Sequence, residues 1–277
     1  MAVLSESLST RVKDSFEGLL TKKLLKTLII VIISLTAFVL VWWGLSIWAN
    51  TEYLPDPGEV YTAFINSYSQ LDPGLNTTMW QNIWASLQRF VWGFLLAFVV
   101  AVPLGLLMGS SRLVETFSRP IVEVFRPIPP IAWVPILILL FGYIMGPIIT
   151  IFIGVFFPIL SSVIFGVRSV DPVLIDAAKT QGAKRWHVFS KVIMPFTVPF
   201  IMTGIRIGMG IGWMCIVAAE IIGGQGGGVG FYISYQSDIG RYAYAYAGMA
   251  TLAILGLLTT SLSGYIENRV NKRMGMK

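Results

Sequence analysis

Long apolar runs separated by short polar segments dominate the pattern of this chain. A helix needs about 20 apolar residues to cross a hydrocarbon layer about 30 Å thick. Runs of this length lie at residues 27–48, 83–109, 121–142, 147–167, 197–222 and 246–266. The pattern therefore predicts an all-α integral membrane protein with six transmembrane helices, in which 27–48 is the first helix and 83–266 form the core domain.

The positions of the basic residues predict how these helices are oriented. Of the 20 Lys and Arg, all but Arg89, Arg206 and Arg241 lie in residues 1–26, 110–126, 168–191 and 269–277. Lys and Arg accumulate in the cytoplasmic loops of membrane proteins. The sequence therefore predicts a multi-pass protein of the cytoplasmic (inner) membrane, with a cytoplasmic N-terminal segment 1–26, a cytoplasmic loop 168–195 and a cytoplasmic tail 267–277.

Composition agrees with this class and excludes several others. The chain is 55% hydrophobic and only 12% charged, whereas about a quarter of the residues of a soluble domain are charged. The net charge of +6 follows from the orientation of the helices, so it does not indicate a nucleic-acid partner. The single cysteine, Cys215, excludes an internal disulfide. With one histidine, His187, we expect no metal site and no catalytic residues.

The glycine-rich stretch GGQGGGVG, residues 223–230, resembles a phosphate-binding loop only superficially. It lacks the Gly-Lys-Ser/Thr of that motif and does not follow a predicted strand. We expect a flexible turn on the outer side of the membrane, and no cofactor bound by this chain.

The cytoplasmic loop 168–195 has the pattern of two short helices. Asp171 and Pro172 are typical of the N-cap and first position of a helix, and Gly182 is well placed to end that helix in a left-handed conformation. A second short helix is expected over residues 183–193, and Pro195 is expected to close the segment. The loop therefore predicts a helix-turn-helix element that projects from the membrane.

Two surfaces of this element favour a protein partner. Ala177 and Ala178 make one surface shallow, while Trp186, Phe189 and Ile193 make another surface apolar although it faces the cytoplasm. Exposed aromatic side chains beside a shallow face are typical of a contact surface.

The loop also resembles a known signature. It contains Asp176-Ala177-Ala178-x-x-x-Gly182-Ala183 and ends in Ile193-Met194-Pro195. This is similar to the E-A-A-x-x-x-G-A signature of the permease subunits of binding-protein-dependent, ATP-driven (ABC-type) importers, with Asp in place of Glu and Met in place of Leu near the end. The stretches LPDPGEVYTAF, RPIPPIAWVPILILLFG and TGIRIGMGIGWMCIVAAEIIGG further resemble the nitrate/sulfonate/taurine/bicarbonate group of these permeases, over residues 40–270.

The resemblance implies a type I importer fold in which the loop is a coupling helix between the fourth and fifth helices. The residues that it assigns to ATPase coupling are Asp176, Ala177, Ala178, Gly182, Ala183, Trp186 and Pro195. It implies three protein partners besides membrane lipid: a cytoplasmic ATP-binding cassette ATPase that uses the ATP, an external solute-binding protein, and a second permease copy. Whether that copy is identical, giving a homodimer, or different, giving a heterodimer, stays open.

Charged and helix-breaking residues within the apolar runs are candidates for a translocation path, because charges at membrane depth are costly and usually functional. Arg206 either lines the path and attracts an anion, or pairs with a carboxylate or backbone carbonyls. Arg89 either lines the path or extends to the outer surface. Glu220 is a gate or a partner for an arginine. Pro129 and Pro130 break the backbone ladder, and free carbonyls are tolerated where they line a cavity.

Small residues repeat every four positions on two of the predicted helices, which lets helices approach closely. They are Gly204, Gly208 and Gly212 on one helix, and Ala101, Gly105 and Gly109 on the other. We expect helix packing at these positions.

The sequence thus predicts the transmembrane permease subunit of an importer for a small oxyanion or sulfonate, and not an enzyme. An importer of the same kind for a quaternary amine or a vitamin precursor is an alternative. An ion-coupled secondary transporter is a second alternative, disfavoured because the apolar runs contain no Asp and show no inverted repeat.

Overall fold

The computed structural model describes the backbone of residues 2–223 and 226–274, with side chains from residue 25 onward. All regular secondary structure in these ranges is helical. The chain divides into two compact units, residues 1–61 and 62–277. Each unit is described separately below.

The first unit contains α1 (Ala2–Ala49) and the beginning of α2 (Pro57–Ser69). Residues 25–49 of α1 are long and apolar enough to cross a membrane, and they contain the predicted first span. Asn50, at φ 44°, ends α1 in the left-handed conformation that asparagine tolerates. Asp56 begins α2 by accepting a hydrogen bond from the backbone N–H of Gly58 at 2.7 Å. The prediction of a cytoplasmic segment 1–26 falls almost entirely on residues whose side chains lie outside the described part.

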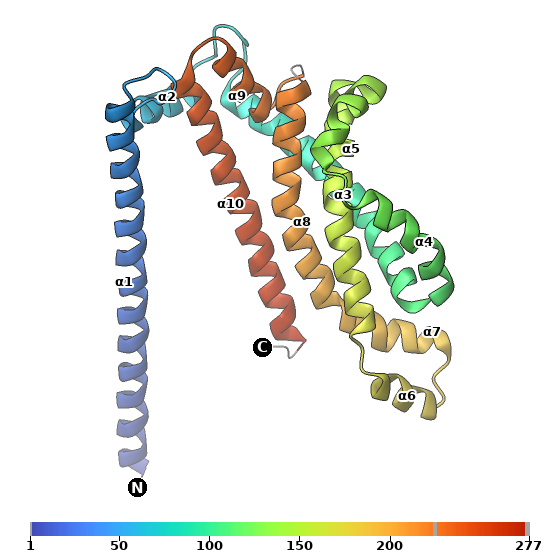
Figure 1. Cartoon of the computed structure of the whole chain (residues 1–277). Helices are drawn as coiled ribbons and strands as arrows, with labels where there is room; N and C mark the ends of the chain where they lie inside the picture. Colours follow the sequence, from blue (N-terminus) through green and yellow to red (C-terminus); the bar gives the residue numbers. More distant parts are fainter. Residues whose placement is uncertain (1, 224–225, 275–277) are drawn as a thin grey trace. The chain divides into compact units, whose positions relative to one another are not determined.

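The second unit is built around three long helices (Figure 1). Its elements are α3 (Met79–Ser110), α4 (Arg112–Phe125), α5 (Pro130–Arg168), α6 (Pro172–Thr180), α7 (Arg185–Val188), a π-helical turn (Phe189–Ile193), α8 (Met194–Gly223), α9 (Val229–Asp238) and α10 (Tyr242–Arg273). The closest association is that of α5 with α8 and α3, and α10 packs on α8 and α9.

The predicted count of six spans is not confirmed. Among the described residues, five helices are long and apolar enough to cross a membrane. The predicted third and fourth spans share α5, which bends at Gly142 (φ 76°, ψ 179°). The first part of the predicted third span belongs to α4, which carries Arg112, Glu115, Arg119 and Glu123 and does not continue into α5. Its proline-rich residues 126–129 form a turn, because proline cannot supply the backbone N–H that a continuous helix needs.

Two contacts nevertheless indicate how the chain runs after α3 ends. It returns to the opposite end of the second unit before it reaches the bend of α5. Arg168, at the end of α5, forms an ion pair with Glu115 of α4. At the opposite end, Gly223 lies near Ile138 and Tyr143 on either side of the bend. Two short helices, α4 and the first part of α5, therefore make this crossing in place of one straight helix.

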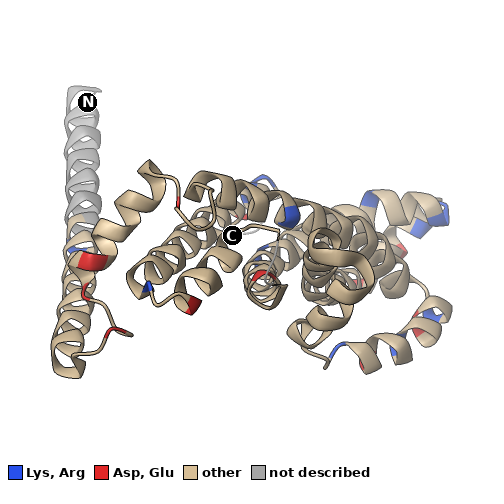
Figure 2. Ribbon diagram, turned by 90° about the horizontal axis from the view of Figure 1, so that it is seen from above, with Lys and Arg blue, Asp and Glu red and all other residues tan. Residues whose placement is uncertain are grey.

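Charged groups are distributed unevenly over this unit. Lys and Arg recur on α4, α6 and α7, with Asp and Glu among them (Figure 2). Arg119 forms ion pairs with Glu123 at 2.7 Å and with Glu115 at 3.9 Å. The basic segments that the sequence assigns to the cytoplasmic side thus lie at one end of α3 and α5.

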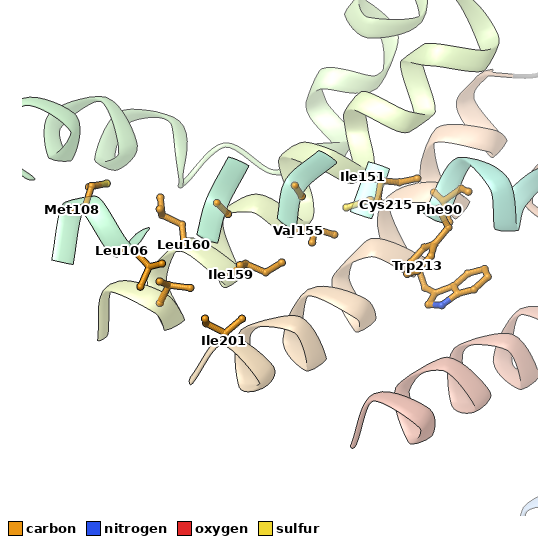
Figure 3. Packing of buried hydrophobic residues seen from close by; sticks show 14 of the residues in the cluster. Phe90, Leu106, Met108, Ile151, Val155, Ile159, Leu160, Ile201, Trp213 and Cys215 are labelled. Carbon is orange, nitrogen blue, oxygen red and sulfur yellow. The ribbon is translucent and has the colours of Figure 1, made fainter. Parts of the chain in front are cut away.

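The core of this unit is apolar and is shared by α3, α5 and α8 (Figure 3). Phe90 of α3 stacks on Trp213 of α8, with ring centroids 4.8 Å apart. Ile151 and Val155 of α5 have no exposed surface. These contacts run along the helices as one continuous apolar cluster.

Glycines bring these helices into close contact. A Cβ atom on Gly105 would lie 2.7 Å from the Cβ of Val163, and one on Gly109 would lie 2.5 Å from the Cβ of Val167. Ala101, on the same face of α3, has no exposed surface. On α8 the corresponding contacts are those of Gly204 with Ser162, Gly208 with Val155, and Gly212 with Phe90 and Val155. The two predicted small-residue faces therefore lie at the contacts of α3 and α8 with α5 and with each other.

Gly105→Ala is expected to lower the free energy of unfolding by about 1–3 kcal/mol, because the added methyl group overpacks the contact between α3 and α5. Gly256→Ala in α10 is the matched control, since nothing lies within 4 Å of the added Cβ. Thermal unfolding in detergent measures both. A Gly105→Ala protein as stable as the Gly256→Ala protein would contradict the packing.

Candidate functional site

The loop between α5 and α8 begins with a fixed helix start. Asp171 accepts a hydrogen bond from the backbone N–H of Val173 at 2.9 Å, and Pro172 occupies the first position of α6. The hydrogen bond satisfies one free N–H of the first turn. The ring of Pro172 fixes its own φ angle close to the helical value. The predicted start of the helix is confirmed.

Gly182 ends α6 in the left-handed region, at φ 82°. The N–H of Gly182 donates to the carbonyl of Lys179 at 2.9 Å, and the N–H of Ala183 donates to the carbonyl of Ala178 at 3.1 Å. A side chain at position 182 would meet no neighbour, so the backbone angle alone requires glycine. The predicted left-handed turn is confirmed, and it fixes the direction in which the chain enters α7.

The loop does not end at Pro195, which corrects the sequence prediction. Residues 185–223 form one unbroken helical rod through α7, the π-helical turn and α8, and the rod bends between α7 and α8 (Figure 1). The N–H of Met194 donates to the carbonyl of Phe189, five residues earlier. This wider turn accommodates a proline, which has no N–H to donate, without breaking the rod.

The side chains of this loop are mostly exposed. Trp186 is 71% exposed and stacks on Phe189, with ring centroids 5.7 Å apart. Asp176 forms an ion pair with Lys179 at 3.0 Å in which both side chains are exposed. Ala177 beside them is exposed and Ala178 is partly buried. A rigid aromatic pair and a shallow alanine face therefore stand together on one helix-turn-helix element.

A buried polar cluster occupies the other end of α3 and α8. Arg89 donates to Glu220 at 2.9 Å, and Ser86 donates to the same carboxylate at 2.9 Å. Arg89 is 6% and Glu220 3% exposed. We call Asn82, Ser86, Arg89 and Glu220 the Arg89 cluster. Its arginine does not extend to the surface, as one sequence interpretation had it, because a buried carboxylate holds it.

The Arg89 cluster holds the glycine-rich loop by its backbone. Arg89 donates to the carbonyls of Gly226 and Gly227. The N–H groups that follow are also bonded: that of Gly228 to Asn82, that of Val229 to Ser86, and that of Gly230 to Glu220, at 3.0, 2.9 and 2.9 Å. One backbone group from each of the five residues 226–230 thus has a partner on α3 or α8. Among the described residues this loop is therefore clamped, not a flexible turn.

Arg206 has a carboxylate partner that sequence reasoning did not identify. Its guanidinium lies 3.4 Å from Glu267 of α10, and Thr203 donates to the same carboxylate at 2.9 Å. The side chain of Arg206 is 57% exposed and that of Glu267 only 10%. The predicted cytoplasmic tail from 267 onward is thus helical up to Arg273, and its first residue packs against α8.

Pro129 and Pro130 mark the start of α5. Pro129 is the N-cap residue and Pro130 occupies the first helical position, where its missing N–H is not needed. Pro130 lies against Gly154, within 3.4 Å of a Cβ built there. The two prolines shape the turn that separates α4 from α5, and their role in a path stays a prediction.

A second polar contact joins the segment after α2 to α9 and α10. Asp72 accepts hydrogen bonds from the N–H groups of Gly74 and Leu75, from Gln236, and from Arg241 at 3.3 Å. Burial alone would raise the pKa of this carboxyl, but the hydrogen bonds and the charge of Arg241 outweigh it, so the pKa lies below its ordinary value of 3.8. The only basic residue of the predicted outer loops is thereby neutralised.

Comparison with protein families identifies the chain. Residues 101–274 match the family of binding-protein-dependent transport system inner membrane components. The chain belongs to this family. It is a permease subunit of an ABC importer, a transport component of the inner membrane.

Relatives of this permease are named for the transport of taurine and nitrate. It is 34% identical to the taurine transport system permease protein of Escherichia coli (strain K12) over 81% of this chain and 82% of the relative. It is 37% identical to the nitrate import permease protein of Leptolyngbya laminosa over 73% of this chain and 71% of the relative. The predicted group of permeases is confirmed.

The fold of the permease is also that of a solved importer. A structure of the MetNI methionine ABC transporter in an inward-facing conformation superposes with a TM-score of 0.60 and 23% identity, covering 69% of this chain and 97% of that chain. At this identity the match concerns the fold alone. It agrees with the predicted all-α transporter architecture.

Asn82, Ser86 and Glu267 were not identified from the sequence of the permease, whereas Arg89 was a candidate. Asn82, Ser86 and Arg89 lie at positions i, i+4 and i+7, so they share one face of α3. That spacing was an available signal, because polar side chains on one face of an apolar helix require partners. Glu267 gave no such signal, since it lies beyond the predicted end of the last span.

Asp72→Asn is expected to lower the free energy of unfolding of the permease by about 1.5–3 kcal/mol at neutral pH, the cost of weakening hydrogen bonds to a buried charge. A carboxyl whose pKa is lowered in the folded state stabilises it above the ordinary value of 3.8. That stability is lost as the pH falls through the lowered pKa. Thermal unfolding of both proteins between pH 7 and pH 3 measures the difference, which must narrow below about pH 4. A difference independent of pH would contradict the assignment.

Proposed function

We propose that this permease docks a separate cytoplasmic ATP-binding cassette ATPase through residues 176–195, and that it imports a small oxyanion or sulfonate. The observation that carries the proposal is the exposed element around Gly182, Ala177 and Trp186. Trp186 is 71% exposed and stacks on Phe189. A preordered aromatic side chain binds a pocket with little loss of conformational entropy.

The surroundings of Trp186 support a protein partner. Val173 is 70% and Leu174 48% exposed on the adjoining helix. Apolar side chains gathered in this way on a polar loop indicate an interaction surface. Arg185 and Lys184 flank them, so a partner with an apolar groove and acidic edges fits this element.

The helical rod 185–223 supports transmission of movement. The helix runs without a break from the docking loop into α8, and α7 lies at an angle to α8 (Figure 1). A displacement of the docked loop is therefore passed to α8 through the π-helical turn Phe189–Ile193. ATP binding would draw two docked loops together, and hydrolysis would release them, so that the path opens alternately to either side. ATP is bound and hydrolysed by the partner ATPase.

The proposed orientation places the basic ends of α3, α5 and α10 in the cytoplasm, together with both termini. Asp72 and Arg241 then lie outside, where segments 50–81 and 223–245 receive an external solute-binding protein. A second copy of this permease completes the path as a homodimer in membrane lipid. The segregation of Lys and Arg supports this orientation.

One face of α8 fits the lining of an anion path. Arg206 is 57% exposed on this face, and a charged side chain is disfavoured against lipid. Gly210, one turn further along α8, has nothing within 4 Å of the position of a Cβ, and Met214, one more turn along, is 73% exposed. The face therefore offers an open strip with one basic group. Taurine and nitrate, named for two relatives, are cargoes to which such a group is suited.

Trp186→Ala is expected to weaken binding of the ATPase subunit about tenfold or more, because a central aromatic side chain supplies much of the energy of an interface. Trp84→Ala, which removes an equally exposed tryptophan (61%) from the far end of α3, is the control. Co-purification in lipid nanodiscs and ATPase activity with loaded binding protein measure both. If the same amount of ATPase subunit co-purifies with both variants, docking through this loop is refuted.

Arg206→Gln is expected to lower import of the anionic solute about tenfold, while Arg206→Lys retains it, because the passing anion requires a positive charge. The change in stability is expected to stay at about 1 kcal/mol, since the arginine is 57% exposed and Thr203 still donates to the Glu267 carboxylate. Uptake into proteoliposomes and thermal unfolding are measured in parallel. If the Gln variant transports normally, or if both variants lose stability and transport together, Arg206 is structural only.

A further inference from the structure

We infer that the Arg89 cluster is a releasable latch: it clamps the glycine-rich loop 226–230 while the path is closed to the outside, and it lets go when α8 moves during the ATP cycle. The inference deepens the proposed function and rests on it. It assigns to Arg89 and Glu220 a role in gating, and it removes them from the groups that contact the solute.

Arg89 is not available to a passing anion. Its guanidinium donates to Glu220 and to the carbonyls of Gly226 and Gly227. Arg89 and Glu220 are both more than nine-tenths buried. A solute would have to displace a carboxylate and two carbonyls to reach this charge. The cluster therefore binds the backbone of the loop and does not contact the solute.

The cluster joins two helices through the loop. Asn82, Ser86 and Arg89 belong to α3, whereas Glu220 belongs to α8. Each of the five bonded backbone groups of the loop depends on one of these four side chains. The loop keeps this conformation only while Glu220 stays within hydrogen-bonding distance of Ser86 and Arg89 on α3.

Movement of α8 relative to α3 would break these hydrogen bonds. Glu220 lies near one end of the rod 185–223, and the docking loop lies at the other. A displacement of the docked end that shifts or rotates the rod relative to α3 separates Glu220 from Ser86 and Arg89. Buried charges without partners are unfavourable, so intermediate positions are avoided and the latch is either closed or open.

The loop itself is suited to two conformations. Gly226, Gly227 and Gly228 all have positive φ, at 92°, 73° and 114°, and glycine changes between such conformations at little cost. At Gly228 a Cβ would lie 2.3 Å from Oε1 of Glu220, so only glycine allows the closed state. Once the side chains release the backbone, these glycines are free to adopt other backbone conformations.

The first test compares variants in nanodiscs that contain the permease, its ATPase subunit and the external binding protein. Glu220→Gln keeps the shape of the side chain but removes its charge, and Ser86→Ala removes one bridging hydroxyl. Both are expected to raise ATPase activity without binding protein, by roughly fivefold for Glu220→Gln and by less for Ser86→Ala. Stimulation by loaded binding protein falls correspondingly, because the closed state no longer resists opening.

Thr259→Val is the matched control. It removes the hydroxyl of α10 that accepts a hydrogen bond from Trp213 of α8 at 2.8 Å, without touching the loop. Its ratio of stimulated to unstimulated activity is expected to equal that of the wild type. If Glu220→Gln and Ser86→Ala behave like this control, or if stimulated and unstimulated rates fall together, the cluster is a static clamp and the latch is refuted.

A second measurement uses the wild-type complex and needs no variant. Hydrogen exchange of the amides at 228–230 is expected to accelerate when a non-hydrolysable ATP analogue and loaded binding protein are bound, since their acceptors on Asn82, Ser86 and Glu220 are withdrawn. Unchanged protection would overturn the proposal. Failure of the wild-type complex to respond to binding protein at all would instead contradict the proposed function, so the two failures are distinguishable.

Discussion

The close approach of α5 to α3 and α8 at glycine positions is the constraint on which the rest of the structure depends. Gly105 and Gly109 meet Val163 and Val167 at distances that leave no room for a side chain. In a lipid environment the hydrophobic effect does not drive helices together, so close packing of this kind has to hold them. It sets the separation at which Arg89 of α3 reaches Glu220 of α8.

The same packing joins the two ends of the permease. The docking element at Gly182 and Trp186 continues without interruption into α8, and α8 carries Glu220 at its opposite end. The loop around Gly182 and the groups around the glycine-rich loop are therefore connected by one unbroken helix. In the proposed function the energy enters through the docked ATPase, so the permease itself needs no catalytic chemistry.

Local features of the sequence predicted much of this arrangement, and features that depend on tertiary contacts were missed. Asp171, Pro172 and Gly182 specify a helix start and stop by local backbone chemistry, so α6 was predicted correctly. The π-helical turn before Pro195 and the bend at Gly142 depend on how neighbouring segments pack. The hydropathy pattern shows neither of them. Glu267 was missed because its partner, Arg206, lies 61 residues away in the sequence.

Uptake into proteoliposomes tests the central claim most directly. The vesicles contain the permease and its ATPase subunit, with ATP inside and with binding protein and labelled taurine or nitrate outside. The account predicts accumulation of the labelled solute that requires ATP and the binding protein together. Accumulation without ATP, driven by an ion gradient across the same vesicles, would contradict it and identify a self-contained carrier.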